Sequence, residues 1–502
     1  MSKRTSQRRF IELLYNPITY IGVVTATVVF FLECFLFCLS LVNPGHNLYL
    51  GLITFLVFPP FLFLGLVLIP IGALWKWRRQ KLGKSEIGKK WLAIDLSVPA
   101  QLNTFIVLFI VTSILALMSL VGSYKAFHYT ESVEFCGALC HTVMHPEYTT
   151  FKSSPHGRVK CAECHIGPGA DWYVQAKLSG IRQVIRTLSN SFERPIKTPV
   201  ENLRPAEDTC KQCHWPGKYF GTFDFNRMYY TSEEDASPWF MRMLLNVGGG
   251  DYQSYGVHAH MNLDHDIFYA AEDDRRQEIS WVKSVDKEGG ETIFTTEDSP
   301  WINTPPPPER IRQMDCIDCH NRPTHQFLPP DRLINRALQY GEIDPNLTDI
   351  KALAVEALAK EYSSTEEAIT SIDKMLRDFY STDDGSLSEP KQMAVEKAIQ
   401  KIVELYKNNM FPEMKTRWET HPDNIGHFHT PGCFRCHSGE HRSSAGKTIS
   451  RDCNACHLVV EQGPLDQIEK NIEGLVFRHP VDIGDSWKEM SCSDCHTGAQ
   501  VE

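Results

Sequence analysis

Three long apolar stretches occupy the first quarter of the chain, at residues 18–42, 48–74 and 102–122. A helix needs about 20 consecutive apolar residues to cross about 30 Å of hydrocarbon. Each stretch is long enough, so the pattern predicts three transmembrane helices. A cleaved signal peptide is the alternative for the first stretch, but no A-x-A cleavage site follows it and a second apolar stretch comes at once.

Basic residues flank these stretches unevenly. Four Lys and Arg residues precede the first stretch, and the segment WKWRRQKLGKSEIGKK at 75–90 lies between the second and the third. The loop at 43–47, between the first and the second, has neither Lys nor Arg. Because loops rich in Lys and Arg stay in the cytoplasm, we predict a cytoplasmic N-terminus. The large part of the chain after residue 122 is then exterior.

The part of the chain after residue 122 contains different hydrophobic patterns in different segments. Short alternating runs of apolar and polar residues between 215 and 304 predict one or two β-hairpins. Residues 331–419 contain no cysteine, and their apolar residues recur at i, i+3 and i+4, which predicts several helices. These patterns indicate a mostly α protein with little β structure.

Cysteine is frequent, with 16 in 502 residues, and 14 of the 16 form seven close pairs. In every pair a histidine directly follows the second cysteine. Six pairs have the spacing CxxCH, and the earliest, CGALCH, has three residues between its cysteines. The motifs are Cys136/Cys140/His141, Cys161/Cys164/His165, Cys210/Cys213/His214, Cys316/Cys319/His320, Cys433/Cys436/His437, Cys453/Cys456/His457 and Cys492/Cys495/His496.

The spacing CxxCH is the signature of covalent haem c attachment, in which two thiols bind the porphyrin and the histidine binds the iron. Zinc sites and disulfides also use paired cysteines, but neither needs a histidine directly after each second cysteine. The motifs therefore predict seven haem c groups. All seven lie on the exterior side, where the attachment chemistry takes place. Cys34 and Cys38, in the first apolar stretch, are expected to pack against neighbouring helices.

The expected fold is thus three N-terminal transmembrane helices followed by a haem-packed multihaem cytochrome c domain with a helical insertion. Haems are expected to supply much of the exterior core. Five parts are predicted: a membrane domain at 1–122, a three-haem module at 123–220, a connecting region with the fourth motif at 221–330, a haem-free helical insertion at 331–420, and a C-terminal three-haem module at 421–502.

Each haem iron takes a sixth ligand, and 13 of the 20 histidines lie outside the motifs. Five of these lie near a motif with Gly or Pro close by: His156, His325, His427, His441 and His479. His258 and His260 form an HxH pair between which the sequence does not choose. Five further histidines are not expected to bind an iron: His128, His145, His265, His421 and His429.

Charge also divides the chain at residue 122. Residues 1–122 contain 11 Lys and Arg against 4 Asp and Glu, which leaves 40 against 57 for the exterior part. Such an acidic surface argues against nucleic acid as a partner and favours a basic protein, although a solvated surface without a partner has the same composition. A periplasmic c-type cytochrome, basic in charge, is the expected partner.

The segment ESVEFCGALCHTVMHPEY, with SPHGRVKCAECHIGPGADWYVQAKLSG and NLRPAEDTCKQCH after it, resembles the NapC/NirT family of membrane quinol dehydrogenases. The likeness covers roughly residues 101–220. The later motifs, from PGCFRCHSGEH to CSDCH, are similar to those of longer members in metal-reducing bacteria. The resemblance implies oxidation of menaquinol at the bacterial inner membrane, with the haem domain in the periplasm, in anaerobic or extracellular respiration.

The resemblance also implies roles for single residues. Smaller members ligate the first haem through a methionine just after its motif; Met144 matches, but it stands three rather than two residues after His141. The quinol-site lysine of the family corresponds to Lys177, twelve residues after the second motif. The acidic residue expected further on is replaced by Val184, so no proton acceptor is carried over. By the same resemblance, His156 ligates the third haem.

The residues themselves favour a quinol site beside the first motif. Only 13 residues separate Gly122 from Cys136, which keeps that haem near the membrane lipid. Oxidation of a quinol releases two electrons and two protons, so it needs an electron acceptor and a base. Glu131 and Glu134 lie in this link and could take the protons.

Two functions follow. The first is a conduit that takes electrons from the menaquinone pool and passes them to a soluble or outer cytochrome. The second is a terminal reductase, in which one haem keeps an open site for a small molecule such as nitrite. The altered CxxCK motif of some reductases is absent from the sequence, which favours the conduit. The oligomeric state, a homo-oligomer included, stays open.

Overall fold

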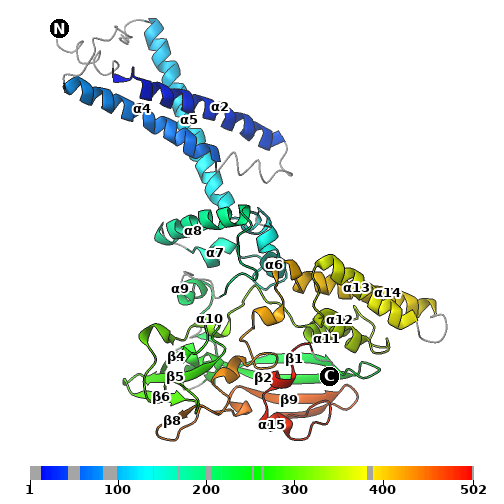
Figure 1. The fold of residues 1–502 in the computed structure, drawn as a ribbon. Coiled ribbons are helices and arrows are strands. Elements are labelled where there is room, and N and C mark those ends of the chain that lie inside the picture. The colour runs from blue at the N-terminus through cyan, green and yellow to red at the C-terminus, as the bar shows by residue number, and fades with distance from the viewer. Residues whose placement is uncertain are drawn as a thin grey trace. The chain divides into compact units, whose positions relative to one another are not determined.

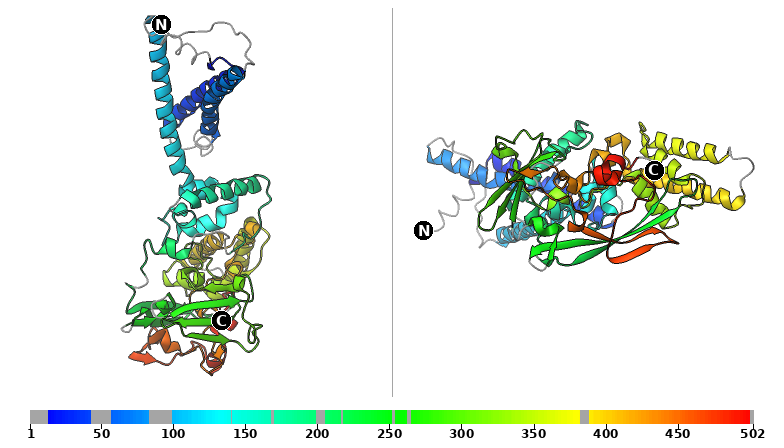
Figure 2. Two further views of the ribbon diagram at one scale, coloured as in Figure 1. Left: turned by 90° about the vertical axis from the view of Figure 1, so that its left-hand side faces the viewer. Right: turned by 90° about the horizontal axis from the view of Figure 1, so that it is seen from below.

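We describe the protein from a computed structural model, which defines residues 13–42, 57–82, 99–139, 141–167, 170–198, 205–215, 218–251, 254–261, 265–381 and 388–499. The chain divides into two compact units, Met1–Leu139 and Cys140–Glu502, each with its own packing (Figures 1 and 2). We call them the membrane unit and the haem unit.

The membrane unit consists of three long helices, α2 (Pro17–Val42), α4 (Phe58–Lys81) and α5 (Pro99–Thr130). Each is long and apolar enough to cross a membrane, which confirms the prediction of three such helices. Helix α5 continues to Thr130, beyond the predicted end at 122, and a π-helical turn η2 (Glu134–Leu139) follows it. The loop at 43–47 and the first part of the second apolar stretch, 48–56, lie outside the described residues.

Small residues allow α2 and α4 to pack closely. A methyl group on Gly22 would lie 2.7 Å from the carbonyl oxygen of Gly65, and one on Gly65 would lie 2.7 Å from the backbone nitrogen of Ala26. The Thr19 hydroxyl donates to the carbonyl oxygen of Ile69 at 3.2 Å. Close backbone approach at small residues is typical of helix pairs in lipid, because dispersion contacts replace the hydrophobic effect there.

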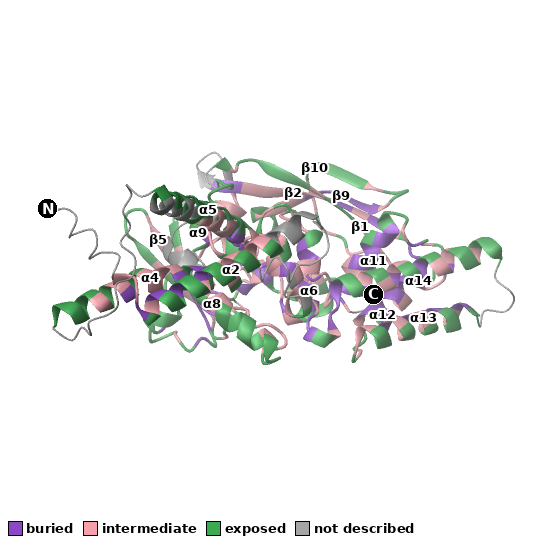
Figure 3. Cartoon of the chain, turned by 90° about the horizontal axis from the view of Figure 1, so that it is seen from above, coloured by how far each residue is buried: buried purple, intermediate pink, exposed green. Residues whose placement is uncertain are grey.

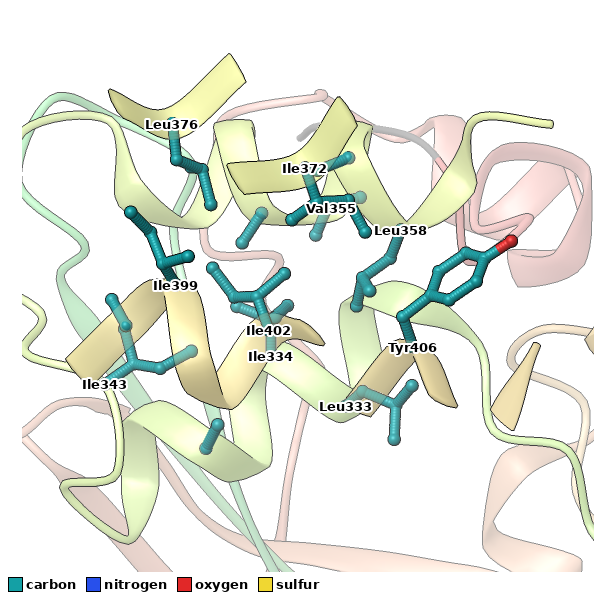
Figure 4. Close-up of a cluster of buried hydrophobic side chains, with 14 of the residues drawn as sticks. Leu333, Ile334, Ile343, Val355, Leu358, Ile372, Leu376, Ile399, Ile402 and Tyr406 are labelled. Atoms are coloured by element: carbon teal, nitrogen blue, oxygen red, sulfur yellow. The ribbon is translucent and has the colours of Figure 1, made fainter. Parts of the chain in front are cut away.

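The haem unit contains a compact helical region of four helices, α11 (Pro330–Gln339), α12 (Ile350–Ala359), α13 (Thr365–Ser381) and α14 (Glu389–Asn409). Their apolar faces form the largest buried cluster of the unit, shown in Figure 4. Buried residues are concentrated in this region in Figure 3 as well. The predicted apolar periodicity between 331 and 419 is therefore confirmed as helices that share a core.

The remaining helices of the haem unit are mostly short, and some of them carry the motifs. The α-helices are α6 (His141–Lys152), α7 (Cys161–His165), α8 (Ala170–Leu188), α9 (Ala206–Cys210), α10 (Cys316–Cys319), α15 (Ser486–Glu489) and α16 (Cys492–Cys495). The 3-10 turns are η4 (Val257–Met261), η5 (Pro308–Arg310), η6 (Pro412–Met414), η7 (Trp418–Thr420), η8 (Gly432–Arg435) and η9 (Cys453–Ala455).

Two antiparallel sheets complete the haem unit. The first has the strand order β1-β2-β9-β10, with β3 paired to β2, and the second has the order β7-β4-β5-β6-β8. The strands of the first are β1 (Thr222–Tyr230), β2 (Pro238–Asp251), β3 (Ser254–Gly256), β9 (His457–Pro464) and β10 (Glu469–Leu475). Those of the second are β4 (His265–Ala271), β5 (Ile279–Asp286), β6 (Glu291–Thr295), β7 (Ile311–Gln313) and β8 (Arg442–Ser443).

These sheets correct the predicted fold class, because the expectation of little β structure was wrong. The hairpins predicted between 215 and 304 are present, but strands from later parts of the chain extend them. Strand β9 pairs with β2, with Leu245 opposite His457, and β8 pairs with β6, with Phe294 opposite Ser443. Pairing over such sequence separations leaves no local period in the sequence, so the pattern alone underestimated the sheets.

Candidate functional site

Each described motif is built on a helical turn. Such a turn brings the two thiols of CxxC to one side and folds the following histidine back over them. In four motifs the histidine amide donates to the carbonyl oxygen of the first cysteine: His214 to Cys210 at 2.8 Å, His320 to Cys316 at 2.8 Å, His437 to Cys433 at 3.0 Å and His496 to Cys492 at 2.8 Å.

Six motif histidines each face one histidine from elsewhere in the chain. The distances between ring centres are 6.3 Å for His165 and His325, 6.0 Å for His214 and His156, 6.4 Å for His320 and His258, 5.7 Å for His437 and His260, 6.1 Å for His457 and His427, and 5.8 Å for His496 and His479.

These distances fit one metal ion between each pair of rings. Two metal–nitrogen bonds of about 2.0 Å in line, with about 1 Å from each nitrogen to its ring centre, place the ring centres about 6 Å apart. The structure brings together both members of the HxH pair, with different motifs: His258 with His320 and His260 with His437. Both histidines of the pair are therefore candidate ligands.

The rings also have the orientation that a ligand needs. In seven of the twelve paired histidines, Nδ1 lies close to a backbone carbonyl or a hydroxyl oxygen, which leaves Nε2 to face the partner ring. Such a second bond fixes the ring and its tautomer in a metal site. The oxygens are Pro323 O for His156, Tyr219 OH for His214, Val247 O for His258, Val257 O for His260, Glu147 O for His325, Ser450 O for His437 and Val481 O for His479.

Burial favours the neutral form of these rings. Desolvation, helped by the charge of Arg322, lowers the pKa of His325 to about 4. Desolvation and the neighbouring His457 lower the pKa of His427 to about 4. Burial also lowers the pKa values of His165 and His260. A neutral imidazole is the form that binds a metal ion, so these sites favour ligation over protonation.

A buried ion pair supports the ring of His325. The Arg322 guanidinium lies 3.2 Å from the Glu147 carboxylate, and its Nε donates to the carbonyl oxygen of His325 at 2.7 Å. Desolvation raises the pKa of Glu147, and the charge of Arg322 opposes that shift. The carbonyl oxygen of Glu147 lies 3.0 Å from Nδ1 of His325. Helix α6 thereby fixes a ring that faces the second motif.

The fourth motif is anchored by Asp318, one of its own residues. Its carboxylate is 3% exposed, accepts from the Tyr269 hydroxyl at 2.5 Å and pairs with Arg312 at 3.0 Å. Asp315 caps the helical turn that carries the motif. The sheet strands β4 and β7, which supply Tyr269 and Arg312, therefore fix the position of this motif.

Consecutive motifs approach one another in chain order from the second to the seventh. At five places a thiol of one motif lies close enough to a thiol of the next to affect its pKa. The pairs are Cys164 with Cys213, Cys210 with Cys316, Cys319 with Cys433, Cys433 with Cys456, and Cys453 with Cys492.

The structure does not support His441 as an iron ligand. This residue is 1% exposed, and its Nε2 lies 2.9 Å from the carbonyl oxygen of Ile279 in β5. The nitrogen that would bind iron is therefore engaged with the backbone. Proximity to the fifth motif suggested His441 as a ligand, but its ring packs against the second sheet instead.

The five histidines that were not expected to bind an iron face no motif histidine in the described part of the chain. His429 pairs with Asp331 at 2.8 Å, and His145 packs against Phe411. His421 differs, because its Nδ1 lies 3.0 Å from the Thr198 hydroxyl while its buried Nε2 has no hydrogen-bond partner among the described residues. No signal in the sequence separates His421 from the others. The remaining two are His128, which packs on Tyr124, and His265, at the start of β4.

The first motif and the predicted quinol residues are described only in part. His141 begins α6, and Met144 lies half-buried one turn later. Cys140 lies outside the described residues. In the membrane unit, Glu131 is half-buried and Glu134 is exposed; in the haem unit, Lys177 is half-buried in α8. Their roles stay predictions.

The donor set as a whole fits covalently attached haem c: paired thiols on a turn, a following histidine, and a second neutral imidazole about 6 Å away. When bound, haem c supplies an iron that cycles between two oxidation states and so carries one electron at a time. The residues that would hold it are the motif cysteines and histidines, with the six facing histidines opposite.

Comparison with known proteins agrees with this fit. Residues 99–215 match the NapC/NirT cytochrome c family, N-terminal region. The chain is 40% identical over 498 residues to the cytochrome c-type protein ImcH of Geobacter sulfurreducens, covering 98% of this chain and 97% of ImcH. It is 27% identical over 113 residues to the cytochrome c-type protein TorY of Haemophilus influenzae, covering 19% of this chain and 30% of TorY. No solved structure matches the chain. This chain therefore belongs to the same cytochrome c family as ImcH, with a NapC/NirT region in its N-terminal part.

Proposed function

We propose that the protein oxidises menaquinol and passes the electrons through seven haems to a periplasmic c-type cytochrome. The six facing histidine pairs carry this proposal. An iron with histidine on both axial sides exchanges electrons but has no position for a substrate. Six of the seven motifs therefore favour an electron conduit over small-molecule catalysis.

The proximity of thiols in consecutive motifs supports a path for electrons within the conduit. Because consecutive motifs interact from the second to the seventh, we propose a single-file order in which the C-terminal motif lies at the exit. The acidic composition of the exterior part favours a basic cytochrome as the acceptor there.

The proposed entry uses Lys177, Glu131 and Glu134. Lysine can hold a quinol oxygen through a charge-assisted hydrogen bond and stabilise the anion left by deprotonation. Each quinol gives up two electrons, which leave one at a time through the first haem, and two protons, for which the two carboxylates are the proposed acceptors. Positive charge before the first span and between the second and third supports an entry on the outer side of the inner membrane.

Replacement of Lys177 tests the entry. We expect Lys177→Leu to slow haem reduction by a menaquinol analogue at least tenfold, while dithionite still reduces every haem. Lys152→Leu, which removes an exposed lysine of the same unit, is the matched control and should behave like the parent protein. Parent-like quinol kinetics in Lys177→Leu would remove Lys177 from the site.

The haem count can be measured directly. The pyridine haemochrome assay should give seven haems per chain, and Cys140→Ala should lose one haem without affecting the others. A count of six in the parent protein would mean that the CGALCH motif is not used.

The iron ligand of the first haem has two candidates, Met144 and the motif histidine His141. Met144 is favoured by the resemblance to the smaller family members, in which a methionine takes the place of the motif histidine. Methionine ligation gives a charge-transfer band in the oxidised spectrum that histidine ligation lacks. Met144→Leu should abolish that band if Met144 is the ligand, and His421→Ala should leave it unchanged.

A terminal reductase, in which one haem keeps an open site, is the second candidate. An open iron site at the first motif would bind carbon monoxide in the reduced protein and would turn over nitrite. We expect neither. Stoichiometric binding of carbon monoxide together with nitrite reduction would favour the reductase.

A further inference from the structure

Helix α8 (Ala170–Leu188) presents an apolar face to its surroundings instead of to the protein. Five aliphatic side chains within three turns of this helix are between 45% and 83% exposed. They recur at the helical spacing i, i+3, i+6, i+7 and i+10, so they lie on one side. The five are Leu178, Ile181, Val184, Ile185 and Leu188.

The other sides of α8 carry polar and small residues. Arg182 and Arg186 are exposed and flank the apolar face. Ala176, Ser179 and Gly180 are half-buried, but a methyl group on Gly180 would meet no atom within 4 Å. A surface helix of a water-soluble domain buries its apolar stripe and exposes its polar side. Helix α8 departs from that rule, because its apolar side is exposed as well.

We propose that α8 is an interfacial helix, with its apolar face in the outer leaflet of the membrane and Arg182 and Arg186 at the lipid phosphates. A helix with a clear apolar side and basic residues beside it binds in this way, with its axis in the plane of the membrane surface. The proposal concerns membrane contact and does not depend on which reaction the haems serve.

Two observations favour lipid over a protein partner. The chain already carries three helices that can cross a membrane, the last of which ends at Thr130. Lipid is therefore always present at high local concentration, whereas a protein partner is not. In addition, the basic pair stands out on an exterior part with an excess of acidic residues, and guanidinium groups form bidentate hydrogen bonds with phosphate.

The proposal also sharpens the proposed quinol entry, and this step rests on the proposed function. Lys177 lies one turn before Ile181 and two turns before Val184, on the apolar side of α8, and it is half-buried. Long lysine side chains extend along apolar surfaces and keep the ammonium near the polar boundary. A quinol that leaves the bilayer beside α8 would therefore meet Lys177 without crossing water.

A spin label at the end of the helix tests the membrane contact. Full-length protein with Cys34→Ser, Cys38→Ser and Leu188→Cys would be labelled and placed in nanodiscs of phosphatidylethanolamine and phosphatidylglycerol. At position 188 we expect oxygen, which concentrates in lipid, to relax the label at least threefold more than a water-soluble nickel complex. Ile472→Cys, at a 76% exposed position of the first sheet, is the control and should show the reverse.

Two results would overturn the proposal. Greater relaxation by the nickel complex at 188 would place the helix in water, and low access to both reagents would mean contact with protein, either a second copy or a partner. A second variant, Arg182→Glu with Arg186→Glu, should reduce oxygen access at 188 in anionic nanodiscs but not in phosphatidylcholine alone. Equal values in the two lipids would exclude an attraction of the two arginines to anionic headgroups. Lys177→Leu tests quinol oxidation separately, so either idea can fail alone.

Discussion

The helical region α11–α14 and the segments that carry the last motifs are stabilised in different ways. In the helical region, Ile334, Ile372 and Ile402 are 0% exposed and belong to one continuous apolar cluster. Near the sixth and seventh motifs, Ile472 and Val476 are 76% and 77% exposed. The first region has an aliphatic core of its own. The second consists of short turns and strands, and we expect its order to depend on covalent attachment to haem. In that case side-chain burial and cofactor attachment share the stabilisation of one unit.

The largest expected effect comes from preventing haem attachment. In cells without the cytochrome c maturation system, we expect segments 141–215 and 433–499 to lose nearly all protection against amide hydrogen exchange. Helices α11–α14 should stay protected, because their core consists of side chains alone. Loss of protection in all segments together would show that the helical region also needs the haems.

A cavity in the helical core should destabilise the helical region and leave the haem-binding segments unchanged. Leu358 in α12 is 1% exposed, so Leu358→Ala should lower the free energy of unfolding of this region by about 2–5 kcal/mol. The haem spectrum should not change. Met393→Ala, at a 67% exposed position of α14, is the matched control and should change stability by less than about 0.5 kcal/mol. A changed haem spectrum in Leu358→Ala would contradict the idea that the helical region and the haem-binding segments are stabilised separately.

Two histidine replacements distinguish a proposed iron ligand from a histidine with a structural role. His260→Ala should convert one haem to the high-spin form, because it removes the ring that faces His437. His441→Ala should leave every haem low-spin, but it should destabilise the protein by about 1–3 kcal/mol, because the carbonyl of Ile279 loses its partner. Electron paramagnetic resonance and thermal unfolding measure the two effects. A high-spin signal in His441→Ala would restore His441 as a ligand.

The smallest expected effect concerns the acidic surface. Electron transfer to a basic cytochrome should slow about tenfold as ionic strength rises from 0.01 to 0.15 M, because the screening length falls from about 30 Å to about 8 Å. Stopped-flow mixing with the reduced protein measures this rate. A rate that is independent of salt would exclude electrostatic steering and leave the conduit itself intact.

The local features of this molecule could be predicted from the sequence, and the long-range ones could not. The transmembrane helices, the helices of the insertion and the motif residues depend on spacing within a few turns, and the structure has the predicted helices. The pairing of strand β9 with β2 depends on residues more than 200 positions apart, which no local period reveals.

The facing histidines show the same limit within the candidate site. His427 and His441 both lie near the fifth motif, yet only His427 faces a motif histidine. The difference is that Nε2 of His441 lies against the backbone carbonyl of Ile279, and tertiary packing decides that contact. His258 and His260 looked like alternatives because they are two residues apart, whereas the fold gives each its own partner.

The turn η4 carries both His258 and His260 on five consecutive residues of backbone, Val257–Met261. On the proposed ligand assignment, these two rings would hold two different metal centres. A change to the backbone of η4 would therefore disturb the ligands of both centres at once, whereas a change at any other facing histidine would disturb one.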